Sequence, residues 1–457
     1  MSEFGLFDEF PQVSAQQWKQ KIQYDLKGAD YNETLVWESP EGIKVKPFYH
    51  AEDLDKSWVP SQEIEKWHIA QSMYVTDTSK ANQKANDVLS KGVESLIFTI
   101  PTVKINLIDL LEGINLSKVP IHFKFEFFPT EPLKLLLSNV QGKNAQLYFH
   151  IDPIGNLAKT GNWHQSQQED LLTLLELSEL VSAQNKVSTI TINSTVYQNA
   201  GANIVQQLAY TLAHANEYAY RLKSKLQAPI FNVSVGGNYF FEIAKIRALR
   251  WLWSTLAKEY SVDEKCHIIA TPSKRNKTLY DYNVNMLRTT SECMSAVLGG
   301  ADTVCNLSYD ALYHKDNEFA ERIARNQLVL LKEESYFEEN ANATEGAYYI
   351  EHLTRQLAEK ALALFKQIET SGGFLDALFK GKIQKKIKES AEKEQTLFEE
   401  GQTTLVGTNK YENPKDRMKD DLELYPFLKK RSEKTQIVPI IETRWAEELE
   451  QKRLNDE

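Results

Sequence analysis

Few polar side chains of this chain stand where chemistry would be expected. The residues that follow its short apolar runs are Tyr74 and Thr76, Thr99, Phe127 and Phe128, Asp152, Asn193 to Thr195, Gly236, Thr271 and Ser273, and Asn306 and Ser308. Asp152 is the ionisable member of this set, and an Asp-Pro pair after a strand is commonly a turn cap. We therefore expect Asp152 to shape a turn, and we assign no catalytic, cofactor-binding or metal-binding residue to this chain.

Local motifs do not supply the missing chemistry. The sequence contains no G-x-x-x-x-G-K-[ST], G-x-S-x-G, C-x-x-C or H-E-x-x-H. Gly236 and Gly237 follow a strand-like run, where either a ligand close to the backbone or a tight strand-to-helix turn would explain them. Cys266, Cys293 and Cys305 are too few and too widely spaced for a disulfide framework or a thiolate metal site, and they suit a reducing cytoplasm.

Charge and composition limit the classes of partner. The 457 residues carry a net charge of -10 at pH 7, whereas a nucleic-acid-binding face needs clustered cations. No apolar run approaches the roughly 18 residues of a membrane-spanning helix. The residues before Lys19 include acids but no Lys or Arg, unlike a signal or transit peptide. The sequence thus predicts a soluble, cytoplasmic protein that binds neither nucleic acid nor membranes.

The elements that must position any site alternate in a regular order. Short β-branched or aromatic runs occupy residues 68–74, 95–100, 121–127, 146–151, 187–193, 229–235, 266–271 and 302–307. Amphipathic stretches between them include 79–91, 168–183, 203–226, 239–260, 284–298 and 318–334. Because parallel neighbours need long crossovers, which are usually helices, this alternation predicts a closed (β/α)8 barrel. The alternative is an open doubly wound sheet, which usually has fewer units and a glycine-rich first turn.

The sequence outside this repeat predicts an arm and an extension. Residues 16–26 have helical spacing, and 34–49 alternate like a strand pair around a turn. Helices are predicted at 348–370, about 384–400 and 444–453, with a charged linker or surface strap from Pro414 onward. We divide the chain into an N-terminal arm (1–65), the barrel (66–345) and a helical extension with a linker (346–457). The arm is too short for its own core, so it must lie on a partner or fold back on its barrel.

Long stretches of the chain resemble one family. They are YFFEIAKIRALRWLWST (239–255), LRTTSECMSAVLGGADTVCNL (287–307), FAERIARNQLVLLKEES (319–335), GAYYIEHLT (346–354), SGGF (371–374), LVGTNKY (405–411) and the opening residues 10–54. In this collinear order they resemble the barrel of the methylmalonyl-CoA mutases. The resemblance implies a (β/α)8 barrel from a family that rearranges carbon skeletons with radicals made from adenosylcobalamin.

The chain departs from the catalytic members at the barrel mouth. Their segment SGYHIREAGA aligns with residues 193–202, and Val196 replaces a His that contacts the thioester. Their segment HTQTSGW aligns with residues 269–275, where Ile269 replaces a second His and Thr271 replaces the Gln. Their block containing YRGRPWT, with a substrate-facing Tyr and CoA contacts, has no counterpart near residues 73–91. An aliphatic group in place of an imidazole removes hydrogen bonding and proton exchange.

The resemblance extends to the small subunits of heterodimeric mutases. Residues 195–203 (TVYQNAGAN) and 152–161 (DPIGNLAKTG) are similar to theirs, and the sequence lacks D-x-H-x-x-G, whose His is the lower axial ligand of cobalt. The resemblance therefore implies a non-catalytic small subunit that binds no cobalamin alone, and we expect it to lack the flavodoxin-like cobalamin domain. Its implied partner is a large catalytic subunit that binds adenosylcobalamin and acyl-CoA and interconverts (R)-methylmalonyl-CoA and succinyl-CoA.

Other functions stay open at this point. The chain could be a subunit of a related acyl-CoA mutase, or an active barrel that borrows cobalamin from a partner chain. A free-standing barrel enzyme of unrelated chemistry would need an acid–base pair, and the sequence shows none.

Overall fold

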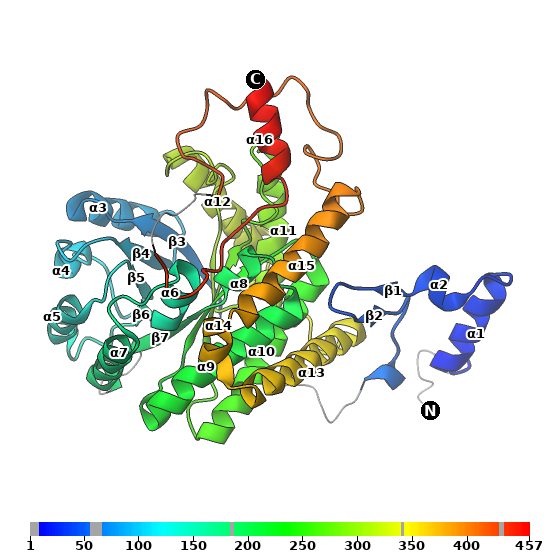
Figure 1. Cartoon of the computed structure of the whole chain (residues 1–457), viewed down its shortest axis with the longest axis horizontal. Helices are drawn as coiled ribbons and strands as arrows, with labels where there is room; N and C mark the ends of the chain where they lie inside the picture. Colours follow the sequence, from blue (N-terminus) through cyan, green and yellow to red (C-terminus); the bar gives the residue numbers. More distant parts are fainter. Residues whose placement is uncertain (1–8, 55–65, 183–186, 340–341, 429–433) are drawn as a thin grey trace, which may run out of the picture.

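The centre of the molecule is a closed barrel of eight parallel strands. The computed structural model describes residues 9–54, 66–182, 187–339, 342–428 and 434–457 (Figure 1). The strands are β3 (His68–Tyr74), β4 (Ser95–Ile100), β5 (Ile121–Phe125), β6 (Leu147–Ile151), β7 (Val187–Asn193), β8 (Ile230–Val235), β9 (His267–Pro272) and β10 (Thr303–Cys305). Each pairs with the next, and β10 pairs with β3 to close the ring. The predicted (β/α)8 barrel is confirmed, and the open sheet is wrong.

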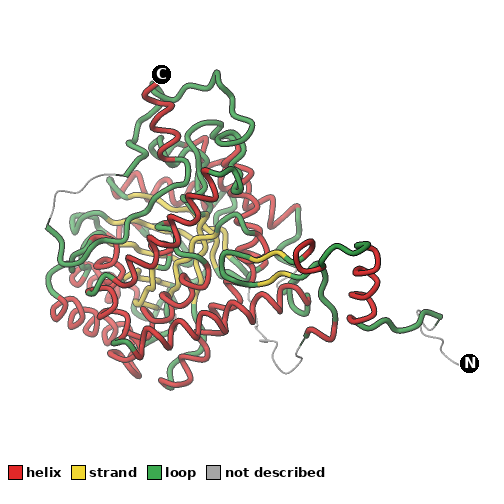
Figure 2. Tube along the Cα trace, turned by 45° about the vertical axis from the view of Figure 1, so that its right-hand side comes forward, coloured by secondary structure: helices red, strands yellow, loops and turns green. Residues whose placement is uncertain are grey.

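Helices surround the barrel, as Figure 2 shows by the red coils around the yellow strands. They are α3 (Thr78–Leu89), α4 (Leu107–Leu110), α5 (Thr130–Val140), α6 (Pro153–Thr160), α7 (Gln167–Ser182), α8 (Thr195–Asn199), α9 (Ile204–Leu222), α10 (Tyr239–Tyr260), α11 (Val284–Leu298) and α12 (Glu318–Val329). The predicted helices correspond to α3, α7 and α9 to α12. Helices α4, α6 and α8 were not predicted, because they span eight residues or fewer and carry little periodicity. Helix α5 was also missed, although its 11 residues include the buried Leu133, Leu136 and Val140 at helical spacing.

Two helix ends differ from the prediction for identifiable reasons. Helix α9 ends at Leu222 because Lys223 takes a positive φ of 51°, which breaks the helical path. Helix α12 passes into a π-helical turn, Leu330–Glu334. The buried Lys332 of that turn donates to the Trp67 carbonyl at 2.8 Å and to Glu94 Oε2 at 2.8 Å, at the entry to β3.

The described part of the N-terminal arm lies beside the barrel (Figure 1). It contains α1 (Ala15–Asp25), α2 (Tyr31–Leu35) and the antiparallel pair β1 (Trp37–Glu38) and β2 (Lys44–Val45). The ring of Trp37 meets Phe241 of α10 edge-on, and Tyr49 stacks on Tyr349. Helix α1 has no buried residue and projects from the body of the molecule (Figure 1). The arm is therefore anchored by its second half.

The C-terminal extension packs directly on barrel helices. It comprises α13 (Tyr348–Thr370), α14 (Gly373–Phe379), α15 (Lys382–Glu399) and, after a long irregular stretch, α16 (Glu447–Asp456). Helix α13 lies along α9 and α10 (Figure 1). Arg247 of α10 pairs with Glu351 of α13 at 2.6 Å, and each side chain is 2% exposed. The division of the chain at residues 65 and 345 stays a prediction.

Loss of one partner in this ion pair should loosen the extension. We expect Glu351→Gln to lower the free energy of unfolding by about 3 kcal/mol or more, because it leaves a buried guanidinium without its counter-charge. Urea denaturation provides the measurement. The control is Glu359→Gln, which disrupts an exposed pair with Arg355 on the same helix and should cost less than about 1 kcal/mol. Equal losses in the two variants would contradict this role for the buried pair.

Candidate functional site

The carboxyl ends of the strands open into a cavity of about 660 Å³ at the barrel mouth. Half of the residues predicted for this mouth line it: Thr99, Phe127, Phe128, Asp152, Asn193, Thr195 and Thr271. Others lie outside its lining: Tyr74, Thr76, Ser194, Gly236, Ser273, Asn306 and Ser308. Since chemistry on this fold takes place at the carboxyl ends of the strands, the cavity is the candidate site.

The mouth holds more ionisable groups than the sequence suggested. Besides Asp152, the cavity is lined by Lys124, Glu126, His150, Lys159, His164, Lys274 and Glu442. The prediction that Asp152 is its ionisable group was therefore wrong. Lys124 and Glu126 alternate with phenylalanines along β5 and the residues that follow it, and this period of two is the signal that could have found them.

Asp152 is the structural hub of the mouth. Its carboxylate accepts hydrogen bonds from the Gly155 backbone NH at 2.7 Å, the Asn193 backbone NH at 2.8 Å and the Tyr218 hydroxyl at 2.7 Å. His214 Nε2 lies 2.9 Å from the same group. The predicted capping role is confirmed, because the Gly155 bond caps α6. His214 is the partner that sequence analysis missed.

The surroundings of Asp152 keep it ionised. Burial would raise its pKa, but the facing His214 and the bonds from Tyr218 and Gly155 outweigh burial and hold the pKa below its usual value. Every described partner of this carboxylate binds the charged form. An Asp used in this way caps a helix and joins β6, β7 and α9, and it has no proton to exchange near neutral pH.

A ladder of neutral histidines fills the barrel below the cavity. Asn232 Nδ2 lies 3.1 Å from His150 Nδ1, and His150 Nε2 lies 3.2 Å from His122 Nδ1. An amide NH₂ group can only donate, so Asn232 donates to Nδ1 of His150. The other ring nitrogen of His150, Nε2, therefore carries the proton and donates to Nδ1 of His122. Burial lowers the pKa of both rings well below the usual value, and the neighbouring cationic groups act in the same direction. His122, on β5, thus bonds to a residue that lines the mouth.

Apolar packing fills the two positions, 196 and 269, at which the family resemblance implied histidines in catalytic members. Val196 and Ile269 are each 1% exposed, and neither lines the cavity. Val196 belongs to the main core between the barrel and its helices. Ile269 packs in a small cluster with Ala70, Ile97 and Cys305. Thr271, by contrast, faces the cavity.

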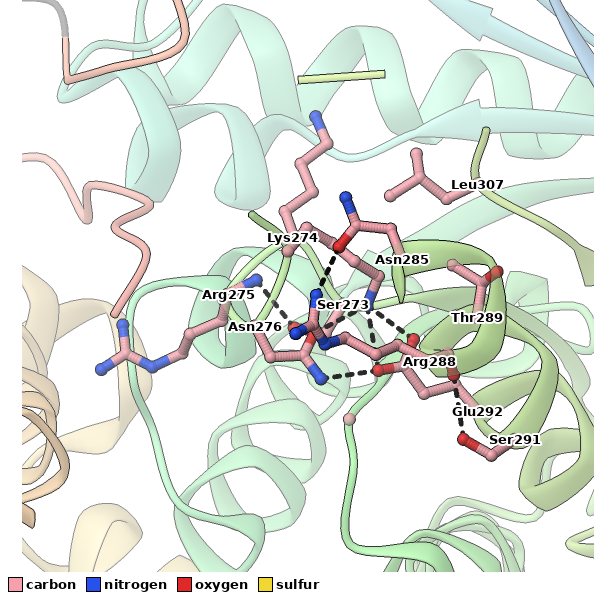
Figure 3. A network of polar contacts seen from close by, with 12 residues as sticks. Ser273, Lys274, Arg275, Asn276, Asn285, Arg288, Thr289, Ser291, Glu292 and Leu307 are labelled. Carbon is pink, nitrogen blue, oxygen red and sulfur yellow. Dashed lines mark hydrogen bonds and ion pairs between the residues drawn. The ribbon is translucent and has the colours of Figure 1, made fainter. Parts of the chain in front are cut away.

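The loop after β9 (residues 273–283) forms one side of the mouth and is held by buried contacts. The Lys277 ammonium lies 2.7 Å from Glu292 Oε2, and Asn276 Nδ2 donates to the same carboxylate at 2.7 Å (Figure 3). Asn285 Nδ2 donates to the Thr278 carbonyl at 2.9 Å. These buried contacts tie the loop to α11, so the preceding Lys274 projects from a fixed base.

Gly236 and Gly237 form a strand-to-helix turn. The Gly236 NH donates to Glu242 Oε1 at 2.9 Å, and neither glycine lines the mouth cavity. A Cβ at Gly236 would meet Glu242 Oε1 at 3.2 Å, which is a tight contact. These contacts favour the turn over a ligand as the reason for the glycines.

Residues 434–445 cross the mouth, and we call them the cross-mouth segment (Figure 1). The backbone NH groups of Gln436, Ile440 and Thr443 donate to the carbonyls of Gly161, Ala158 and Asn199 at 3.0, 2.8 and 3.0 Å, respectively. At its end, the buried Arg444 pairs with Glu450 Oε2 at 2.7 Å. The predicted surface strap is thus partly buried, and it brings Glu442 into the cavity lining.

The described residues also bear on metal binding and membrane insertion. No group of three or more His, Cys, Asp or Glu side chains is arranged there to hold a metal ion. No helix in the same ranges is both long and apolar enough to cross a bilayer.

The fold and site define a (β/α)8-barrel protein whose polar mouth is crossed by its own C-terminal segment. Residues 103–455 match the family model described as methylmalonyl-CoA mutase, and the chain belongs to this family. It is 35% identical to the methylmalonyl-CoA mutase small subunit of Porphyromonas gingivalis, over 89% of this chain and 71% of that protein.

Two proteins of Streptomyces virginiae are also similar. The chain is 28% identical to the methylmalonyl-CoA mutase small subunit, over 84% of this chain and 68% of that protein. It is 25% identical to the methylmalonyl-CoA mutase large subunit, over 91% of this chain and 62% of that protein. The match thus spans roughly two thirds of the length of these relatives.

The lowered pKa of Asp152 predicts a particular pH dependence. A carboxylate with a depressed folded pKa stabilises the fold above its unfolded pKa of about 3.9, and this contribution is lost as the pH falls through the folded value. We expect Asp152→Asn to cost about 2–3 kcal/mol at pH 7. Its difference from wild type should shrink below about pH 4.

Urea denaturation from pH 7 to pH 3 checks this prediction. Asp87→Asn is the control, because Asp87 is an exposed residue paired with Lys91 and should contribute less than about 0.5 kcal/mol. A penalty for Asp152→Asn that stays constant down to pH 3 would show that the charge of Asp152 is not what stabilises the fold.

Proposed function

We propose that this chain is the small, non-catalytic subunit of an adenosylcobalamin-dependent methylmalonyl-CoA mutase. In this proposal it completes and stabilises a heterodimer whose large subunit interconverts (R)-methylmalonyl-CoA and succinyl-CoA. The burial of Val196 and Ile269 carries the proposal, because catalytic relatives have histidines at these positions. The similarity to two proteins named as small subunits supports it.

The chemistry of the mouth supports a non-catalytic role. Aliphatic side chains at 196 and 269 can neither bond a thioester nor exchange a proton. Asp152 and His214 do form an acid–base pair, but His214 is fully buried and Asp152 is held ionised by its partners. These contacts make the pair a structural element.

The mouth of this chain does not fit the corrinoid cofactor. Both ring nitrogens of His150 are engaged by His122 and Asn232, and His164 packs edge-on against Phe128. The cross-mouth segment also occupies the face on which a broad, flat ring would have to lie. We infer that adenosylcobalamin and the acyl-CoA bind to the large subunit. A cytoplasmic location is inferred as well, and the free, buried thiols of Cys266, Cys293 and Cys305 suit its reducing conditions.

If the mouth performs no chemistry, changes in it should leave turnover intact. The subunit is purified with and without a co-expressed large subunit, and mutase activity is assayed in each preparation. We expect activity in the assembled complex, with Thr271→Ala and Val196→Ala within about twofold of wild type. Val196→Ala should cost about 1–3 kcal/mol of stability through loss of buried methyl groups.

Assembly by gel filtration is the control for this assay, so that a folding defect is not taken for a catalytic one. A hundredfold loss of kcat in stably assembled complex would instead support an active barrel that borrows cobalamin from its partner. Activity toward a different branched acyl-CoA would support the related-mutase alternative.

The N-terminal arm is the best candidate for contact with the large subunit. Trp18 of α1 is 51% exposed and Tyr24 is 79% exposed, whereas the β1–β2 pair already packs on the protein's own helix α10. Aromatic anchors of this kind commonly dominate the binding energy of an interface. We therefore propose that α1 binds the partner while the hairpin anchors the arm.

Substitution of an anchor should weaken assembly and spare the fold. Trp18→Ala is expected to weaken affinity for the large subunit by about tenfold or more, with little change in melting temperature. Surface plasmon resonance and circular dichroism measure the two effects. Tyr411→Ala is the control, because Tyr411 is also an exposed aromatic residue (77%, against 51% for Trp18) but belongs to the C-terminal extension. If Trp18→Ala melts the isolated chain and leaves affinity unchanged, the arm is an internal strap.

A further inference from the structure

We propose that the mouth cavity is a binding site for a small oxyanion, a carboxylate or a phosphate, whose charge is neutralised by Lys124. This inference does not depend on the proposed function, because a binding site of this kind requires no catalysis. It rests on uncompensated positive charge and on buried polar atoms that lack partners.

Lys124 is the centre of the proposed site. It lies on β5 where the side chain faces the barrel interior, and it lines the cavity. In the described ranges no hydrogen bond or ion pair within 4.0 Å engages its ammonium. Burial lowers its pKa, Cys305 opposes this shift in part, and Lys159 and Lys274 lower the pKa further. A mostly buried cation without a counter-ion is costly, and a bound anion would remove that cost.

Two further ammonium groups face the same space. Lys159 extends from α6 and Lys274 from the loop after β9, on different sides of the mouth. Figure 3 shows Lys274 pointing away from the bonded network around Glu292, with no dashed contact at its ammonium. Neither lysine has an ion pair within 4.0 Å in the part of the chain that the structure describes. Three cations from separate elements thus converge on one cavity.

The carboxylates of the mouth leave this charge uncompensated. Asp152 is saturated by Gly155, Asn193, Tyr218 and His214. Glu126 accepts from the Tyr74 hydroxyl at 3.1 Å, at the rim. Glu442 of the cross-mouth segment lines the cavity, but it lies beyond ion-pair distance of the three lysines in the described structure. The three ammonium groups are therefore left without a direct carboxylate partner in the described ranges, and an external anion could bind to them.

Neutral polar groups in the cavity could orient a bound anion. The Thr191 hydroxyl and Asn232 Oδ1 both line the cavity, and both are buried with no hydrogen-bond partner. Thr191 can donate to an oxyanion, and Asn232 can accept from a hydroxyl group or water carried with it. Phe125, Phe127 and Phe128 form an apolar wall that suits a small hydrocarbon body. The lining thus fits a small organic anion with a polar head.

Isothermal titration of the full chain with succinate and, separately, inorganic phosphate tests the proposal. Buffers contain Hepes and chloride at constant ionic strength, so that general screening is the same in every titration. Wild type is expected to bind about one equivalent of at least one probe. Lys124→Met should weaken that binding at least tenfold. Lys118→Met is the matched control, because Lys118 is an exposed lysine outside the cavity.

The two probes identify the head group. Binding of succinate alone supports a carboxylate ligand, binding of phosphate alone supports a phosphate ligand, and Lys124-dependent binding of both supports a general oxyanion site. Each of these results requires that Lys118→Met behaves as wild type.

Thermal denaturation shows whether the Lys124→Met variant is folded. Without the probe, Lys124→Met should melt cooperatively at or above the wild-type temperature, because it removes an uncompensated charge. The probe should raise the melting temperature of wild type and of Lys118→Met, but not that of Lys124→Met. The proposal is overturned if neither probe binds wild type. It is equally overturned if Lys124→Met binds as tightly as wild type, or if the variant melts below wild type in the absence of probe.

Discussion

Closure of the eight strands into a barrel turns every second side chain of each strand toward a shared interior. This constraint places Lys124, His150, Asn232 and Thr271 in one space, although they come from four different strands. It also decides that Ile269 packs against the neighbouring strands inside the barrel and Val196 against the surrounding helices. The character of the mouth follows from which residue types occupy the inward positions.

Buried polar groups of the interior differ in how fully they are bonded. Below the mouth, burial lowers the pKa of His122 and His150 and keeps the rings neutral, and their contacts with each other and with Asn232 offset part of the cost of burial. At the mouth, Asp152 is fully bonded, whereas Lys124 and Thr191 are not. The ionised group that most resembles a catalytic acid thus serves the fold, whereas the uncompensated charge, that of Lys124, is positive. A cavity of this kind is suited to hold an anion.

The outer parts of the chain rely on a few buried contacts between distant segments. Arg247 and Glu351 join the extension to the barrel, and Arg444 with Glu450 joins the tail to the loop after β9. The N-terminal arm has no comparable ion pair to the barrel in its described residues, and it relies on ring contacts such as that of Trp37 with Phe241. This difference leaves α1 exposed and available to a partner.

The sequence by itself determined the strands, the longer helices, the barrel and the family, because periodicity and collinear motifs are properties of neighbouring residues. It also predicted Asp152 as a cap, which the structure confirms, and Val196 and Ile269 as departures from catalytic members, which stays a prediction. The tertiary structure alone decided that His214 faces Asp152, that residues 434–445 cross the mouth, and that Lys124 lies in the cavity without a partner. These contacts join segments far apart in the chain, and they depend on barrel closure and strand register, which no local pattern specifies.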